Sequence, residues 1–152
     1  MVERYERFSA AVSGIYCCIQ KIEAEVMNEY GLKGSCAQYL AAMRNNREGV
    51  TVSGFSEICA KDKAAVSRAI SELETKGFVM RKGVSSGAYR APVVLTDKGK
   101  TVAEYVEKQA SAAVEIAGAG LSDEERATFY SVLGHIASNL SDMSKKGLNK
   151  KD

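Results

Sequence analysis

Few side chains in this 152-residue chain could act as nucleophiles, metal ligands or acid–base catalysts. The four cysteines, Cys17, Cys18, Cys36 and Cys59, form no CxxC pair, and His135 is the single histidine. A structural zinc site needs four Cys or His ligands at short paired spacings, so these residues predict no metal site. A histidine within an apolar helical pattern is typical of a structural residue rather than a general base.

Signals for catalysis are weak elsewhere in the chain too. Phosphate-binding loops of the GxGxxG or GxxxxGK[ST] kind are missing. No histidine lies near Cys59 in sequence to make that thiol a nucleophile. We therefore expect no catalytic residues, no cofactor and no enzymatic activity.

The cysteines are interpreted first as small buried hydrophobes, since thiols are expected to be reduced in a protein without a secretion signal. Cys18 is expected on or beside a buried apolar stripe, and Cys59 is expected to pack after Ile58 on the apolar edge of a short helix. A thiol sensor is the alternative. In that case Cys36, at the start of a helix, or Cys17, four residues before Lys21, would react first.

The charge distribution indicates a different chemistry, the binding of anions. Residues 61–100 carry nine basic and four acidic side chains, a net charge of +5. Residues 1–60 carry six and seven, and residues 101–152 carry six and eight. A basic segment in a chain of net charge +2 is typical of a local anion-binding surface, with an ordinary solvated face as the alternative.

A helix predicted over residues 63–76 lies in this basic segment. Asp62 is a good N-cap, and Gly77 stands where a C-cap glycine belongs. The apolar edge consists of Val66, Ile70 and Leu73. The opposite face holds Ala64, Arg68, Ser71, Glu72 and Thr75, flanked by Lys63 and Ser67.

That polar face suits DNA recognition. Arg68 can bond guanine O6 and N7, and Ala64 can pack on a thymine methyl group. The first backbone N–H groups of the helix can bond a phosphate. Acidic residues at positions 72 and 74 place the expected contact in the first two turns. The candidate DNA-binding residues are Lys63, Ala64, Ser67, Arg68, Ser71, Lys82 and Arg90.

Two long helices at the ends of the chain carry apolar stripes. The first runs to about residue 30, where Gly31 supplies the C-cap, and its stripe residues are spaced alternately three and four apart. At about 40 Å it is too long for a small domain to cover, so we expect a partner chain. A capping box over residues 122–125 opens the last helix. The candidate dimer-interface residues are Tyr5, Phe8, Val12, Ile15, Phe129, Leu133, Ile136 and Leu140.

The remaining pattern predicts helices over 35–44 and 97–116 and a short helix containing Phe55, Ile58 and Cys59, capped by Thr51 or Ser53. Strands over 78–82 and up to residue 95 form a hairpin with a flexible basic tip, and Pro92 lies at a strand edge or start. The order of elements predicts a mostly α winged helix-turn-helix fold of about six helices plus a β-hairpin wing, with long N- and C-terminal dimerisation helices. Segments 1–34 and 97–152 would dimerise and 35–96 would form the DNA-binding lobe, together one domain.

The runs AVSR (65–68), LETKGFV (73–79) and LTDKG (95–99), with Arg81 and Arg90, resemble the MarR family of bacterial regulators. The resemblance implies a homodimer on pseudo-palindromic operator DNA, dimerised by the first helix and the last two. It also implies repression as the default activity, Arg90 as the arginine of the wing, and small ligands that often bind between the dimerisation helices and the DNA-binding lobe. The chain departs from the family at Ala88, where an Asp is usual.

The sequence therefore predicts a DNA-binding transcriptional regulator, a homodimeric repressor released by a small-molecule effector. We expect it in the cytoplasm, because no apolar run approaches the ~20 residues of a membrane span and the N-terminus does not resemble a signal peptide. Two alternatives stay open. One is a winged-helix module that binds protein and not DNA, and the other is a thiol-based redox regulator.

Overall fold

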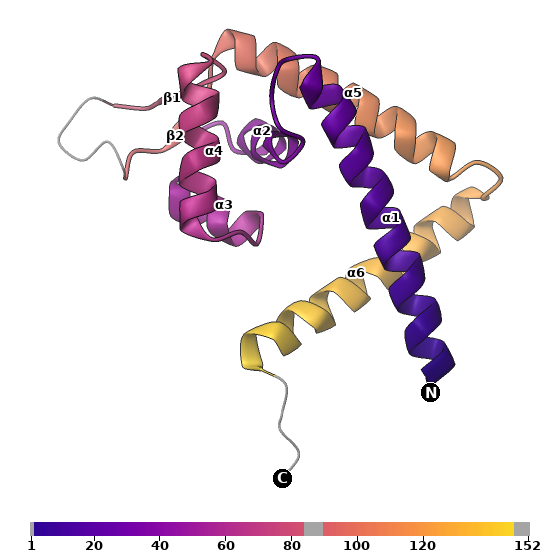
Figure 1. Ribbon diagram of the computed structural model, residues 1–152. Coiled ribbons are helices and arrows are strands. Elements are labelled where there is room, and N and C mark those ends of the chain that lie inside the picture. Colours follow the sequence, from indigo (N-terminus) through magenta and orange to yellow (C-terminus); the bar gives the residue numbers. More distant parts are fainter. Residues whose placement is uncertain (1, 84–89, 148–152) are drawn as a thin grey trace. The chain divides into compact units, whose positions relative to one another are not determined.

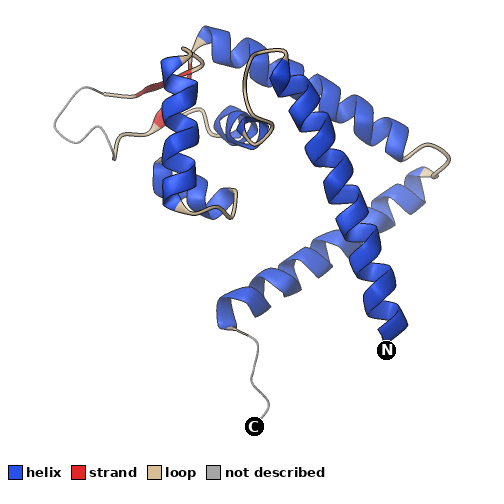
Figure 2. Ribbon diagram, in the orientation of Figure 1, coloured by secondary structure: helices blue, strands red, loops and turns tan. Residues whose placement is uncertain are grey.

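The computed structural model describes residues 2–83 and 90–147 and is mostly helical (Figure 1, Figure 2). The elements are α1 (Val2–Asn28), α2 (Cys36–Asn45), α3 (Val52–Ile58), α4 (Lys63–Thr75), β1 (Val79–Arg81), β2 (Val93–Leu95), α5 (Asp97–Ala117) and α6 (Asp123–Lys146). The predicted fold class, a winged helix-turn-helix with six helices and a two-stranded hairpin, is confirmed. None of the described helices is long and apolar enough to cross a membrane.

The chain divides into two compact units, Met1–Ser111 and Ala112–Asp152. The first unit contains a hydrophobic core built from α2, α3, α4, the hairpin and the adjoining ends of α1 and α5. Its largest fully buried side chains are Phe55, Met27, Leu40, Ile70, Leu73, Val66, Val93 and Cys36. This core positions α4, because the side chains on one face of that helix are entirely enclosed.

The predicted starts of α3, α4 and α6 are confirmed by side-chain caps. Thr51 accepts a hydrogen bond from Gly54 N at 3.1 Å, and Asp62 accepts one from Ala65 N at 2.9 Å. The capping box of α6 is complete, with both the Ser122 and Glu125 bonds formed. These bonds satisfy N–H groups that have no partner within the helix.

The end of α1 is also as predicted. Gly31 has φ of +64° and donates to Asn28 O, while Leu32 N donates to Met27 O, both at 3.0 Å. This pair of bonds is the Schellman motif, which favours glycine because its first residue beyond the helix is left-handed. The chain therefore turns sharply from α1 toward α2.

The hairpin pairs Val79 with Leu95 and Arg81 with Val93 in antiparallel register. Val50 forms a further bridge to Val93 on the other side of β2. Pro92 directly precedes β2 and accepts a hydrogen bond from Lys82 N at 2.8 Å through its carbonyl oxygen, as a residue without an N–H can. The expected place of this proline at a strand start is confirmed.

One prediction about α3 is wrong. Ile58 is 57% exposed, whereas Val52 and Phe55 are buried. At about 100° per residue Val52, Phe55 and Cys59 share one side of this two-turn helix, and Ile58 is rotated away from it. Cys59 packs against the core as expected.

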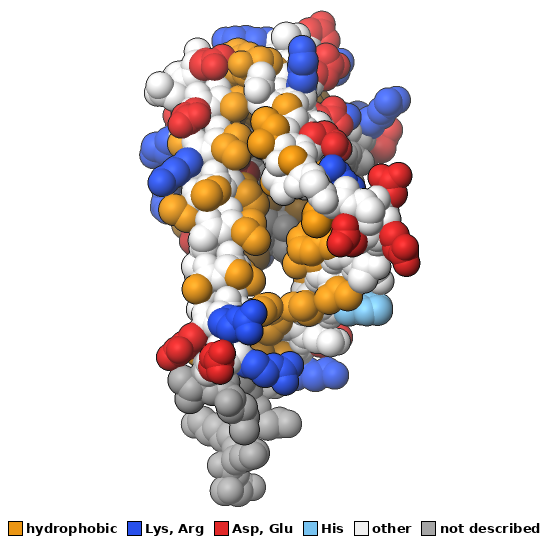
Figure 3. Space-filling view, turned by 90° about the vertical axis from the view of Figure 1, so that its right-hand side faces the viewer, with side chains coloured by type: hydrophobic (Ala, Val, Ile, Leu, Met, Phe, Trp, Pro, Cys, Tyr) orange, Lys and Arg blue, Asp and Glu red, His pale blue; other side chains and the backbone are white. Residues whose placement is uncertain are grey.

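The long helices differ from this core in exposure. Within α1 only Val26 and Met27, at its C-terminal end, are buried, and α6 has no buried residue. Figure 3 shows hydrophobic side chains exposed along the helices that face this side of the molecule. All eight candidate dimer residues are exposed in the single chain except Ile136, which is half-buried.

Candidate nucleic-acid interface

A tight turn joins α3 to α4 and fixes the helix-turn-helix. Ala60 in this turn has φ of +50°, which is uncommon for a residue with a side chain. The Ser56 hydroxyl donates to Lys61 O at 2.5 Å, and Lys61 N donates back to Ser56 O at 3.2 Å. These reciprocal bonds close the turn over Ala60, so α3 and α4 are held as one unit.

The inner face of α4 is the best-buried surface of the helix-turn-helix. Val66, Ile70 and Leu73 are each 0% exposed, as predicted. The opposite face carries Lys63, Ala64, Arg68 and Ser71 in the solvent, with Ser67 half-buried at its margin. The structure thus brings the candidate residues of α4 to one accessible face of this helix, and the helix itself lies beside the hairpin (Figure 1).

The N–H groups at the N-terminus of α4, which are expected to bond a phosphate, lie beside the carboxylate of Asp62. Asp62 already occupies that position, and its carboxylate accepts from Ala65 N. This backbone bond, helped by the nearby charge of Arg68, holds the pKa of the Asp62 carboxyl below its usual value. A carboxylate that stays ionised there repels a phosphate, whereas the cationic side chains of α4 would attract one.

The acidic residues at the C-terminal half of α4 are paired. Glu72 lies 2.9 Å from Lys76 Nζ, and Glu74 lies 3.5 Å from Arg81 Nε. Arg81 is only 16% exposed, and therefore its pair fastens the helix to β1. These contacts balance the charges that were expected to restrict DNA contact to the first two turns.

The base of the wing contains an ion pair that sequence analysis missed. Lys82 Nζ lies 2.7 Å from a Glu48 carboxylate oxygen, and this bond lowers the pKa of Glu48. Both side chains are largely exposed, so the pair is weak and a phosphate can compete for Lys82. Arg90 is exposed on the other arm of the hairpin. The predicted flexible tip, including Ala88, lies outside the described residues.

The cysteines require a correction. Cys36 is 1% exposed, and burial raises the pKa of its thiol to about 11 despite its place at a helix start. Desolvation outweighs the helix dipole here, so the expectation that Cys36 would be among the first to react is wrong. Cys17 and Cys18 are both exposed in the single chain, so burial of Cys18 is not seen.

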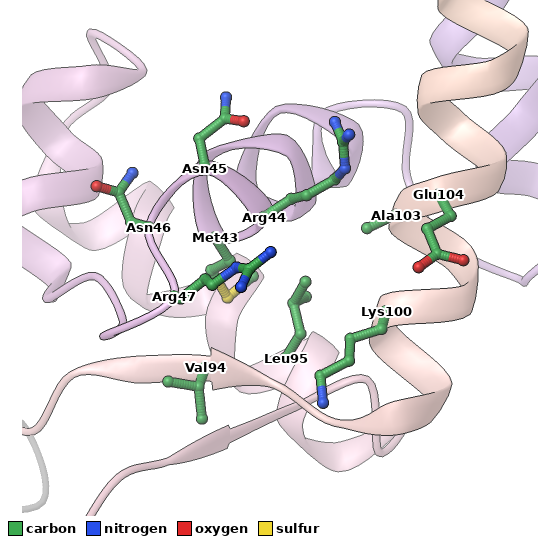
Figure 4. A pocket seen from close by; sticks show the side chains of 10 residues that line it. All are labelled: Met43, Arg44, Asn45, Asn46, Arg47, Val94, Leu95, Lys100, Ala103 and Glu104. Atoms are coloured by element: carbon green, nitrogen blue, oxygen red, sulfur yellow. The ribbon is translucent and has the colours of Figure 1, made fainter.

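A groove of about 610 Å³ lies between the C-terminal end of α2, strand β2 and the first turns of α5 (Figure 4). Met43, Val94 and Leu95 form an apolar part, and Arg47 and Lys100 bring positive charge to it. Arg44 also lines the groove and is paired with Glu107 of α5, and Lys100 is paired with Asp97. Glu104 of α5 also lines the groove, so side chains of both charges surround it.

Two features of the sequence, the run at 83–87 and the single histidine, could suggest catalysis. Residues 83–87 spell GxSxG, the pattern of a hydrolase nucleophile elbow. That elbow links a strand to a helix, whereas this segment links β1 to the antiparallel β2. His135 is exposed on α6 and not in a core. Among the described residues no group of three or more His, Cys, Asp or Glu side chains could hold a metal ion.

Comparison with known proteins places these features in a family. The MarR family profile matches residues 30–87, which include α2, α3, α4 and β1. The Bacillus subtilis HTH-type transcriptional regulator YybA is 28% identical over 119 residues, covering 76% of this chain and 79% of that protein.

Solved structures share the fold. A MarR transcriptional regulator from Methanosarcina mazei has 25% identity and a TM-score of 0.80, covering 91% of this chain and 92% of the other. A MarR family regulator from Listeria monocytogenes, crystallised with a 26-mer DNA, has 20% identity and a TM-score of 0.80, covering 94% and 97%.

The profile match includes the motifs at 65–68 and 73–79. This family consists of transcriptional regulators and not of enzymes, which confirms the non-catalytic prediction. Over residues 30–87 the chain matches the MarR family of helix-turn-helix transcriptional regulators, and over most of its length it is similar to a curated relative and to solved structures of that fold.

Proposed function

We propose that this chain is a cytoplasmic transcriptional repressor that binds pseudo-palindromic operator DNA as a homodimer. The observation that carries this proposal is the division of α4 into a fully buried face and an exposed face bearing Lys63, Arg68 and Ser71. A recognition helix must combine rigid support with accessible donors, and this one does. The complex of the Listeria monocytogenes regulator with DNA supports the same reading of the fold.

In this proposal the N-terminal half of α4 enters the major groove. Arg68 would read a guanine, while Lys63 and Lys82 would contact phosphates. Ser67 and Ser71 would bond phosphates or base edges, and Ala64 would pack on a thymine methyl group. Arg90, on the wing, would reach the minor groove beside the half-site.

The homodimer rests on the exposed apolar stripes. Phe8 and Val12 on α1 and Phe129 and Leu133 on α6 are each more than 40% exposed in the single chain. Contiguous exposed apolar surface of this kind marks a protein interface. A dimer formed through both stripes would bury more than ~2,000 Å² in total, the size of an obligate interface.

Selection of bound duplexes from a random pool tests DNA binding and symmetry together. We expect an inverted repeat whose half-sites are centred about one helical turn apart. Binding should weaken steeply with salt, because cationic side chains displace counterions from phosphates. A pool that yields no enriched sequence at low salt would favour the alternative of a protein-binding winged helix.

We place the effector in the groove between α2, β2 and α5 (Figure 4). Benzoate, which is apolar and anionic, should raise the melting temperature and release the operator, while uncharged benzyl alcohol should do neither. Arg47→Ala should remove the response because Arg47 brings a cation to the groove. An equal response of the variant would place the effector elsewhere.

A further inference from the structure

Side-chain hydrogen bonds join the C-terminal end of α4 to the start of α5 and to the turn that ends α1. We infer that Lys98 is a positioning residue for DNA recognition, which sets the angle of α4 relative to α1 and α5. This inference rests on the proposed DNA binding, although Lys98 itself lies at the end of α4 opposite to the candidate reading residues. Three contacts, from Thr96, Lys98 and Lys76, carry the argument.

The first contact joins α4 to α5. A helix leaves its last carbonyl groups without partners inside the helix. Lys98 Nζ donates to Lys76 O at 2.9 Å, and the Thr96 hydroxyl donates to Gly77 O at 2.7 Å. The start of α5 therefore supplies donors to two carbonyls at the end of α4. A positive charge is also favourable there, because the C-terminal end of a helix dipole is negative.

The second contact fixes Lys98 itself. Its ammonium group lies 4.2 Å from the centre of the Phe78 ring. Phe78 is 2% exposed and meets the Tyr30 ring edge-to-face at 6.4 Å. A cation over a buried ring is attracted by the negative face of that ring. Lys98 is thus anchored on the core as well as on the helix end.

The third contact joins α4 to α1. Lys76 Nζ donates to Gly31 O, in the turn that ends α1, and also bonds Glu72 at 2.9 Å. The start of α5 also packs closely against the segment that follows α4. A Cβ at Gly99 would lie 1.9 Å from Phe78 O, so only glycine fits there. The ends of α1, α4 and α5 therefore meet through Lys76 and Lys98.

The contacts at the C-terminal end of α4 matter for recognition because a small tilt at that end moves the distant N-terminal end of the helix. A helix of 13 residues is about 20 Å long, so tilting it by about 10° at one end moves the other end by about 3 Å. Such a displacement exceeds the tolerance of a hydrogen bond to a base edge. In a dimer the same tilt changes the distance between the two recognition helices. Lys98 should therefore set the preferred spacing of the half-sites.

The test is selection from duplexes that contain the same half-sites at graded spacings. Lys98→Met keeps much of the side-chain stem but loses the charge and the donor. We expect it to lose roughly two- to thirtyfold in affinity at the preferred spacing and to accept other spacings more evenly. Lys98→Arg, which keeps the cation and donors, should restore the preference. Lys108→Met, an exposed lysine of the same helix, is the matched control and should behave as the wild type.

The outcomes distinguish a positioning role of Lys98 from a purely stabilising one. If Lys98→Met loses the same factor at every spacing, Lys98 only stabilises the fold and the inference is wrong. An unchanged affinity and spacing preference would also overturn it. If the wild-type protein itself selects no duplex, the proposed function fails first, and the inference fails with it.

Discussion

Helices α4 and α6 show two ways in which an amphipathic sequence is used. In α4 the apolar residues Val66, Ile70 and Leu73 are all 0% exposed, since α2, α3 and the hairpin surround them. In α6 the apolar residues recur with the same helical period, yet none is buried. The sequence pattern is similar, and the difference lies in what the rest of the chain can cover.

The apolar face of α4 is covered within one chain, whereas the apolar side chains of α6 are not. The winged helix-turn-helix has its own core and offers a polar face to the solvent. The exposed stripes of α1 and α6 leave large apolar side chains in water. Covering them with a partner would gain roughly 25 cal/mol of free energy for each Å² of apolar surface removed from water. We therefore expect mutations in the winged helix-turn-helix and in the stripes of α1 and α6 to affect different properties of the protein, and by different amounts.

The largest effect is expected from a charge in the α6 stripe. Leu133→Asp should weaken dimerisation by about 4 kcal/mol, roughly a thousandfold, because an unpaired carboxylate would be buried at the interface. Operator binding should be lost with the dimer. Sedimentation equilibrium measures the change. Ser131→Asp, on the opposite side of the same helix, is the control and should remain dimeric.

Matched leucines in the two regions sharpen the comparison. Leu40→Ala, in the core, should lower the free energy of unfolding by about 3 kcal/mol through the cavity that it leaves. Leu140→Ala should cost less, and its cost should depend on protein concentration because the partner chain covers that side chain. Denaturant unfolding measured at several protein concentrations distinguishes the two variants. Equal and concentration-independent losses would contradict the distinction.

On the exposed face of α4, substitution should affect DNA binding and not folding. Arg68→Ala should weaken operator binding by about 1–3 kcal/mol and relax specificity at one base in each half-site. Lys63→Ala or Lys82→Ala should weaken all sequences alike and reduce the salt slope by about one. Competition binding with single-base operator variants measures both. An unchanged base preference in Arg68→Ala would refute the placement of α4 in the groove.

The smallest effect is expected at the cysteines. Because burial raises the folded-state pKa of Cys36 to about 11 from 9.0, this thiol leaves stability unchanged below pH 9 and lowers it as the pH rises toward 11. A thiol-reactive reagent added to the folded protein should modify the exposed Cys17 first and leave the buried Cys36 unmodified. A stoichiometric hydroperoxide should not release the operator. Release that disappears in Cys17→Ser would support the redox alternative instead.

Much of the fold could be predicted because local signals and periodicity agree. Residue type predicts Asp62 as a cap and limits the cap of α3 to Thr51 or Ser53, and spacing alone predicts the buried edge of α4. Ile58 was misplaced because a two-turn helix gives too few residues to fix the direction of its apolar side. Cys36 was misjudged because its position in sequence indicates the helix dipole but not the burial that outweighs it.

The candidate site was predicted less completely. The polar face of α4 follows from the period of the helix, and the structure places those residues together. The partner of Lys82 could not be predicted, because Glu48 lies 34 residues away and meets it only through the fold. Lys98 and Lys76 belonged to recognisable motifs, but no sequence signal indicates that their side chains reach carbonyl groups of other elements.

The central claim is that the apolar stripes join two chains so that two α4 helices bind one operator. Sedimentation of the full chain, alone and with the selected duplex, measures both parts by mass. We predict a dimer of the 16.4 kDa chain at micromolar concentration, and two chains for each duplex carrying both half-sites. A folded monomer in solution that binds the duplex as a single chain would contradict the account.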